Sequence, residues 1–270
     1  MQPSSNSFRP KLLVPNSSFR QIVLMGLLGM IALTPAWAET SILLSLMQTA
    51  QALVVVEAEN AAVYGDDVRP LIDERTGAVL LHRRVHPVVQ TRTGTGVILN
   101  PSGFIVTNAH TVQQAGRVSV TLYDNVKFQA ELLFVVPQED LALLKIDAGH
   151  PLPAVPLTDS DKAQLNAKVY TIGGSPLLRN TISEGTISAL GVPRGQSGLG
   201  ENVKFLQVTF NIYQGDSGTP LLDADGRLLG IMMGAQTNQD RIAYAIPSNQ
   251  IAKVVQDYIK QNKDSANAQI

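Results

Sequence analysis

Short apolar runs separated by turn residues dominate the chain from Thr95 onwards. Asn, Asp, Gly and Pro stand between most of these runs, as at Asn100–Gly103, and this pattern is typical of strands joined by tight turns. Many short strands at this spacing predict an all-β barrel or sandwich. The predicted strands are Gly96–Leu99, Phe104–Thr107, Val118–Leu122, Lys127–Val136, Leu141–Ile146, Ala167–Ile172, Gly185–Leu190, Phe205–Phe210, Pro220–Leu222, Leu228–Met232 and Ile242–Ala245.

Two segments of this region break the strand pattern. Pro151–Pro156 holds three prolines in six residues, which excludes a central strand and predicts a linker between two halves of the molecule. Near the end of the chain, apolar residues recur at helical spacing after the start signal Pro247-Ser248-Asn249, so we expect an amphipathic helix over residues 248–262. Its apolar positions are Ile251, Val254, Val255, Tyr258 and Ile259.

The segment before Thr95 is organised differently. Ser41–Val56 is apolar and ends in three consecutive valines, which we interpret as a helical or loose lead-in followed by the first strand. Residues 58–90 are mixed and charged, and this composition predicts a long surface loop. Within it, His82 and His86 stand near Asp66, Asp67 and Asp73; a metal site can be drawn from them, but a solvated loop without metal is the favoured interpretation.

The N-terminus has the three-part layout of a secretory signal. Residues 1–20 carry three basic and no acidic residues, and an apolar run from Ile22 to Leu33 leads to the triplet Ala36-Trp37-Ala38. This predicts a signal peptide over residues 1–38 and an exported protein, periplasmic or secreted. The apolar run is short for a membrane span, and the alternative is an uncleaved N-terminal membrane anchor.

Composition narrows the class of protein further. Apolar residues make up 44% of the 270 residues and charged residues 16%, which indicates a globular chain. The net charge of −1 offers no basic field, so we expect no nucleic-acid partner. The chain contains no cysteine, which excludes a cysteine nucleophile and a disulfide framework.

Three residues have the chemistry of a serine nucleophile site. His110 directly follows a predicted strand and can serve as a general base, while Asp140 opens an apolar run and can orient that base. Ser217 lies in Gly215-Asp216-Ser217-Gly218, where two glycines permit a tight turn that can aim backbone N–H groups at one point, an oxyanion hole. Each feature alone is common, because triads are recognised by geometry and not by sequence position.

Four ordered blocks resemble the high-temperature-requirement (HtrA/Deg) family of trypsin-like serine proteases. Thr93–His110 is similar to the family's histidine block and Asp140–Ile146 to its aspartate block. Gly215–Leu222 is similar to its serine block, and Ala243–Ser248 to the segment that leads into its terminal helix. Together the blocks span most of the chain, which makes the resemblance more specific than any single motif.

The resemblance implies two six-stranded β-barrels of the chymotrypsin/trypsin type with a site in the cleft between them, followed by a C-terminal α-helix. The expected order is an extension with the first strand and the long loop (39–92), the rest of the first barrel (93–150), the second barrel (151–247) and the helix (248–262). The expected partners are polypeptide substrates; no metal or cofactor is expected. Family members often form trimers, so a homo-oligomer is one expectation.

The resemblance also assigns roles to residues. Ser217 would be the nucleophile, His110 the base and acid, and Asp140 the orienting carboxylate, with the N–H groups of Gly215, Asp216 and Ser217 as the oxyanion hole. The segment formed by Ile231, Met232, Met233 and Gly234 would pair with the substrate as an added strand. The residues before the nucleophile, Asn211, Ile212, Tyr213 and Gln214, would line the specificity pocket; because none is acidic, we expect small or medium apolar side chains there.

The chain departs from the family at informative positions. Thr219 stands where members usually have a second glycine, and Asp216 where they commonly have asparagine. Few residues follow Pro247, so we expect no PDZ domain. The predicted function is a serine endopeptidase that works through an acyl-enzyme, in exported protein quality control or processing. The alternatives are a non-catalytic, chaperone-like binding protein on the same scaffold, or a protease that is latent until assembly orders its oxyanion turn.

Overall fold

A computed structural model describes residues 34–60, 63–73, 75–88, 90–173, 181–193, 204–210, 215–233 and 242–261. The chain divides into two compact units, residues 1–43 and 44–270. The first helix among the described residues, α2 (Thr34–Ala50), includes the predicted cleavage position after Ala38, whereas the apolar run Ile22–Leu33 lies outside the described residues. Within the described part, no helix is both long and apolar enough to cross a membrane.

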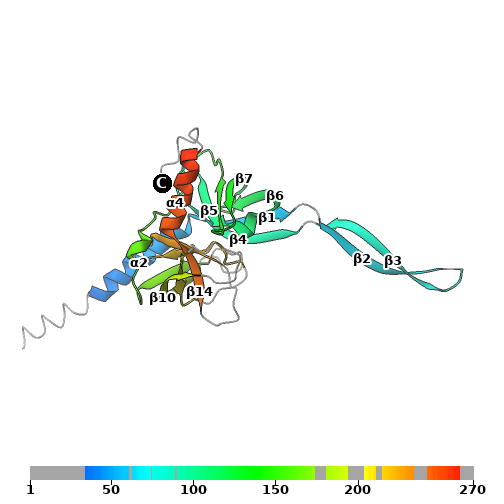
Figure 1. The fold of residues 1–270 in the computed structure, drawn as a ribbon, viewed down its shortest axis with the longest axis horizontal. Helices are drawn as coiled ribbons and strands as arrows, with labels where there is room; N and C mark the ends of the chain where they lie inside the picture. Colours follow the sequence, from blue (N-terminus) through cyan, green and yellow to red (C-terminus); the bar gives the residue numbers. More distant parts are fainter. Residues whose placement is uncertain are drawn as a thin grey trace, which may run out of the picture. The chain divides into compact units, whose positions relative to one another are not determined.

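The first half of the larger unit is a closed antiparallel β-barrel (Figure 1). Its strand order is β1-β4-β5-β8-β7-β6, and three of these strands are buried over most of their length, with Val54, Val56, Ile105 and Leu143 at most 1% exposed. The predicted turn at Asn100 is present, because Leu99 N–H donates to Phe104 O at 2.8 Å. The strands are β1 (Leu53–Asn60), β4 (Thr91–Ile98), β5 (Phe104–Asn108), β6 (Ala115–Thr121), β7 (Lys127–Val136) and β8 (Leu141–Lys145).

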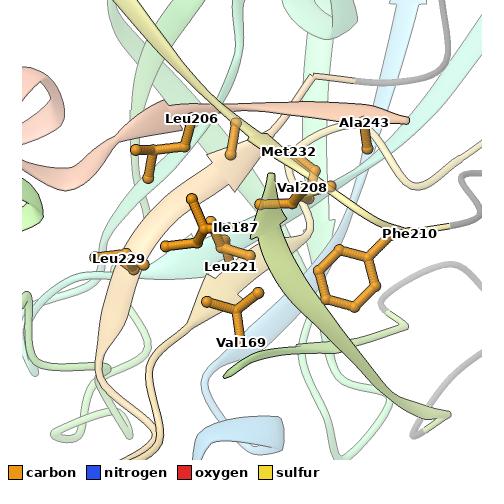
Figure 2. Close-up of a cluster of buried hydrophobic side chains, with 10 residues drawn as sticks. Val169, Ile187, Leu206, Val208, Phe210, Leu221, Leu229, Met232 and Ala243 are labelled. Carbon is orange, nitrogen blue, oxygen red and sulfur yellow. The ribbon is translucent and has the colours of Figure 1, made fainter. Parts of the chain in front are cut away.

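The second half is another closed barrel, with the order β10-β11-β14-β13-β12-β9. Figure 2 shows its core, where Val169, Ile187, Leu206, Leu221 and Leu229 converge from different strands; all are at most 5% exposed. The strands are β9 (Lys168–Ile172), β10 (Ile182–Pro193), β11 (Lys204–Val208), β12 (Pro220–Leu222), β13 (Leu228–Met232) and β14 (Ala243–Pro247). The predicted fold, two six-stranded barrels followed by a helix, is confirmed.

The proline-rich linker is hydrogen-bonded to both barrels. In its first part, Leu152 N–H donates to Pro101 O and Val155 N–H to Ile98 O, both at 3.0 Å. Further on, Pro156 O accepts Leu228 N–H at 2.8 Å from the second barrel. The linker is therefore held by main-chain hydrogen bonds to both barrels, although it contributes no strand to either closed sheet.

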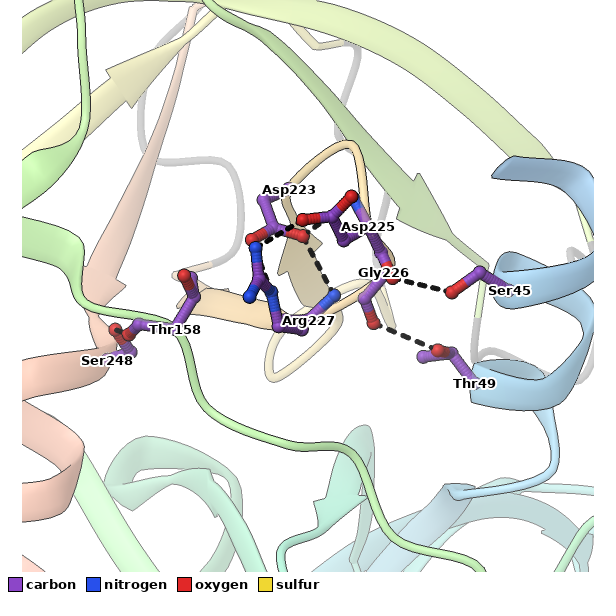
Figure 3. Close-up of polar contacts among 8 residues, drawn as sticks. All are labelled: Ser45, Thr49, Thr158, Asp223, Asp225, Gly226, Arg227 and Ser248. Atoms are coloured by element: carbon purple, nitrogen blue, oxygen red, sulfur yellow. Dashed lines mark hydrogen bonds and ion pairs between the residues drawn. The ribbon is translucent and has the colours of Figure 1, made fainter. Parts of the chain in front are cut away.

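The start of the C-terminal helix α4 (Ser248–Gln261) is hydrogen-bonded to the segment that follows this linker. Ile251 and Val255 are buried, as the helical spacing predicts. The Ser248 hydroxyl donates to Thr158 O at 2.5 Å (Figure 3), and Asn249 N–H donates to the hydroxyl of Ser160 in the short 3₁₀ helix η1 (Ser160–Lys162) at 3.1 Å. The second bond satisfies a backbone N–H group at the start of α4 that has no acceptor within the helix.

The end of α2 is held on the second barrel by two hydroxyl groups. Ser45 Oγ donates to Asp225 O at 2.6 Å and Thr49 Oγ1 to Gly226 O at 3.0 Å (Figure 3). Leu46, between them, is 2% exposed. The turn that accepts these bonds is internally braced, because the Asp223 carboxylate accepts the backbone N–H of Arg227 at 2.9 Å and the Arg227 guanidinium pairs with it.

The segment expected to be a long loop instead contains a β-hairpin. Strands β2 (Val63–Ile72) and β3 (Val79–Val88) pair antiparallel over their whole length and form a separate two-stranded sheet (Figure 1). Its turn is tight, since Gly77 N–H donates to Asp73 O at 2.7 Å. Charged residues in the middle of both strands, such as Asp67 and the residue opposite it, Arg84, interrupt the apolar pattern by which a strand is predicted from sequence.

Candidate functional site

Local strand pairing brings His110 and Asp140 together. His110 lies in the single-turn helix α3 (Ala109–Val112) directly after β5, and Asp140 directly precedes β8. Because β5 and β8 pair with Asn108 opposite Leu141, the two residues emerge at the same end of the barrel. The main chain fixes the junction, since Ala109 N–H donates to Asp140 O at 3.0 Å.

The Asp140 carboxylate holds the His110 ring. Its Oδ2 and Oδ1 lie 2.9 and 3.0 Å from His110 Nδ1, and Oδ1 also accepts the His110 backbone N–H at 3.0 Å. An ionised carboxylate can only accept, so Nδ1 carries the proton and Nε2 is left as an acceptor. Asp140 is 5% exposed and adopts a left-handed φ of 53°, a strained conformation for a residue that is not glycine.

The other ring nitrogen of His110 reaches across to the second barrel. Nε2 lies 3.0 Å from Ser217 Oγ, so the serine hydroxyl donates to the imidazole. Asp140, His110 and Ser217 thus form a continuous hydrogen-bonded row that joins the two barrels. The structure brings together the three residues that the sequence proposes as a nucleophile, a base and an orienting group.

The turn that carries Ser217 is fixed peptide by peptide. Gly215 and Gly218 take left-handed φ values of 97° and 83°, which glycine tolerates. The Asp216 carbonyl accepts Thr219 N–H at 3.0 Å, so the Ser217 N–H, anti to it in the same planar peptide, points to the opposite side. Among the described residues, the Ser217 amide finds no protein acceptor. An outward N–H next to the nucleophile is the geometry that stabilises an oxyanion.

Part of the predicted substrate-binding set is already engaged within the barrel. Met232 N–H donates to Thr219 O at 2.8 Å, and its carbonyl accepts Gly218 N–H at 2.9 Å. Ile231 stands between Pro220 and Ile246 in the sheet, and Met233 N–H donates to Tyr244 O at 2.9 Å. The other predicted members, Asn211, Ile212, Tyr213, Gln214 and Gly234, lie outside the described residues.

The remaining histidines lie on the hairpin and next to the proline-rich linker. The hairpin places His82 opposite Arg69 and His86 opposite Gly65. No group of three or more His, Asp or Glu residues in the part of the chain that is described could hold a metal ion. His150 is exposed and contacts the carbonyl of the next residue, Pro151, at 3.1 Å.

Sequence reasoning missed two supporting residues. Arg92 Nη1 donates to the carbonyls of His110 and Gln113, at 3.1 and 3.2 Å, and so anchors α3. Thr95 is fully buried and donates to the nucleophile turn from the first barrel, with its N–H 2.8 Å from Ser217 O. Thr95 lies in the histidine block, but its partner is more than a hundred residues away, and only the tertiary structure reveals the contact.

Comparison with known proteins gives a consistent result. A model of the trypsin-like peptidase domain matches residues 94–231. The putative serine protease HhoA of Synechocystis sp. is 32% identical over 232 residues, which cover 84% of this chain and 58% of HhoA. The periplasmic pH-dependent serine endoprotease DegQ of Escherichia coli is 33% identical over 216 residues, covering 77% of this chain and 46% of DegQ.

Solved structures show the same likeness. A variant of the HtrA-type protease AlgW, solved with a decapeptide, superposes with a TM-score of 0.66 at 27% identity, covering 82% of this chain and 67% of that one. AlgW with a tripeptide gives a TM-score of 0.62 at 28% identity, covering 81% of this chain and 63% of that one.

The chain spans about half the length of the curated relatives named above, 58% of HhoA and 46% of DegQ.

Proposed function

The chain belongs to the trypsin-like peptidases, and we propose that it is a serine endopeptidase of the HtrA/Deg kind. The observation that carries the proposal is the row of hydrogen bonds from Asp140 through His110 to Ser217, with 2.9 and 3.0 Å between successive partners. The carboxylate favours the imidazole tautomer whose Nε2 accepts from the serine hydroxyl, which is the arrangement that acyl transfer needs.

The proposed reaction proceeds by acylation and deacylation. His110 Nε2 takes the Ser217 hydroxyl proton as Oγ attacks the scissile carbonyl carbon, and Asp140 stabilises the imidazolium. The Ser217 and Gly215 N–H groups, with that of Asp216, would bind the oxyanion. His110 then protonates the leaving amine, and the C–N bond breaks to give an ester on Ser217. Water activated by the same imidazole hydrolyses the ester and restores the enzyme.

Substrate binding is proposed to involve an extended peptide. The HtrA-type protease AlgW and its variant were solved with peptides, which supports polypeptide substrates for this chain. Because the main chain of Met232 and the N–H of Met233 are used within the barrel, strand addition by the substrate would concern the end of the predicted segment, at Gly234. Ile212, Tyr213 and Gln214 are proposed to line a pocket for small or medium apolar side chains.

The names of the relatives support a proposal for the cellular location of the activity. DegQ and the DegP-like proteins of Chlamydia are named periplasmic, which supports an exported, periplasmic location. We propose protein quality control or processing in that compartment, with residues 1–38 as a cleaved signal peptide. Assembly as a homotrimer is proposed only by analogy with the family.

Cleavage of an unfolded protein tests the proposed function. We expect purified wild type to cleave unfolded casein and Ser217→Ala to lose this activity by several orders of magnitude, since the nucleophile is removed. Ser102→Ala, on an exposed turn, is the matched control and should cleave like wild type. Equal cleavage by Ser217→Ala and wild type would overturn the proposal. A stable wild type that binds casein without cleaving it would favour the alternative of a chaperone-like binding protein.

A further inference from the structure

The nucleophile turn belongs to the second barrel, but a residue of the first barrel holds it. Thr95, on β4, is fully buried. Its backbone N–H donates to Ser217 O at 2.8 Å, and its hydroxyl donates to Gly215 O at 3.3 Å. One residue therefore binds two carbonyl groups of the same turn, on either side of Asp216.

Each of these bonds fixes a peptide plane. The peptide between Ser217 and Gly218 is held at both ends, because its N–H donates to Met232 O at 2.9 Å while its carbonyl accepts from Thr95. The peptide between Gly215 and Asp216 is held through its carbonyl by the Thr95 hydroxyl. Glycine imposes little rotational preference, so on its Gly215 side this peptide has no steric reason of its own to keep one orientation. The hydroxyl supplies that preference.

Thr95 is in turn held by two further threonines. The Thr107 hydroxyl, on the paired strand β5, donates to Thr95 O at 2.7 Å. The Thr219 hydroxyl lies 3.5 Å from the Thr95 hydroxyl, at the outer limit of a hydrogen bond. All three side chains are buried, so no bulk water replaces a hydroxyl that is removed. The Gly215 carbonyl is part-buried, and in Thr95→Val it would lose its Thr95 donor, which costs stability of the turn.

We propose that Thr95 is a positioning residue whose hydroxyl, acting on the Gly215 carbonyl, keeps the turn from Gly215 to Ser217 in the orientation that receives the oxyanion. The inference rests on the proposed function. Thr95 touches neither substrate nor the reacting atoms, and it acts through the peptide plane of Gly215. Its contribution should appear in the transition state, where the oxyanion forms, and not in ground-state binding of the substrate.

Comparison of Thr95→Val with Thr95→Ser tests the proposal. Valine keeps the shape of threonine and loses the hydroxyl, whereas serine keeps the hydroxyl. For a peptide substrate, we expect Thr95→Val to lower kcat about tenfold or more with little change in KM, and Thr95→Ser to stay within a few-fold of wild type. The affinity for a peptidyl trifluoromethyl ketone, which forms a tetrahedral adduct on serine, should fall in parallel with kcat/KM.

Several outcomes would overturn the inference. They are a Thr95→Val enzyme with unchanged kcat, a loss that appears in KM alone, or a Thr95→Ser enzyme as impaired as Thr95→Val. If Thr95→Val does not fold, Thr95→Ala, which removes the hydroxyl together with the methyl group, is compared with Thr95→Ser instead, with thermal unfolding recorded for every variant. Failure of the proposed function is distinguishable, because then wild type itself has no Ser217-dependent activity.

Discussion

At the scale of the residue, the site depends on a close contact between the main chains of the two barrels, at Gly218 and Thr95. Gly218 follows the nucleophile with a left-handed φ of 83°, and a Cβ added there would overlap the carbonyl oxygen of Thr95. Glycine is therefore required here by both conformation and space. The same carbonyl accepts the Thr107 hydroxyl, so it has little freedom to move aside.

Substitution of Gly218 should consequently damage both stability and activity. We expect Gly218→Ala to lower the free energy of unfolding by more than about 2 kcal/mol and casein cleavage by at least about a hundredfold. Gly149→Ala is the matched control, because Gly149 has a φ of 71° with nothing within 4 Å of the added carbon; its cost should be about 1–2 kcal/mol from conformation alone. Urea unfolding and initial cleavage rates measure both quantities. Equal losses in the two variants would show that the contact with Thr95 is unimportant.

At the scale of the element, one carboxylate connects the short helix η1 with the start of α4. Asp159 accepts Asn249 Nδ2 at 2.7 Å, lies 3.2 Å from Lys162 Nζ and accepts the backbone N–H of Asp161 at 3.1 Å. The hydrogen bond from Asn249 is the main reason why the pKa of Asp159 lies below its ordinary value of 3.8, followed by those from Lys162 and Asp161. These contacts favour the ionised form in the folded protein.

The stability of this junction should therefore depend on pH in a definite direction. A carboxylate whose folded pKa is depressed contributes stability above its unfolded pKa and loses it as the pH falls through the folded pKa. Asp159→Ala should lower Tm at neutral pH, and the gap to wild type should narrow as the pH drops below 3.8. Asp161→Ala, on the same exposed turn, serves as the control. A gap for Asp159→Ala that stays constant in acid would contradict this account.

At the scale of the whole molecule, the barrels were predictable and the contacts between them were not. Apolar runs bounded by turn residues located the strands, and Lys127–Val136 coincides with β7. The resemblance indicated the order of the blocks, but the left-handed Asp140 and the bonds from Thr95 depend on how the two barrels meet. No local sequence pattern predicts the contacts between the barrels, because the residues that make them, such as Thr95 and Ser217, are far apart in sequence. The hairpin β2–β3 was missed for another reason, its mid-strand charges.

Removal of this hairpin should leave the barrels intact. Asn60 N–H donates to Gln90 O at 2.9 Å, so the ends of the inserted segment are adjacent and a short turn can replace residues 63–88. β2 and β3 pair only with each other among the described strands. We expect the shortened protein to unfold cooperatively with a Tm within about 5 °C of wild type and to keep Ser217-dependent cleavage of a short peptide. Loss of either property would show that the hairpin supports the site.

Labelling of the nucleophile tests the central claim most directly. A fluorophosphonate reacts with a serine only where a base removes its proton and donors stabilise the charge that develops on the phosphonyl oxygen. We predict that the intact protein is labelled at Ser217, located by peptide mass analysis, and that His110→Ala is labelled at least about a thousandfold more slowly. An unlabelled Ser217 in folded protein, or equal labelling of wild type and His110→Ala, would contradict the account.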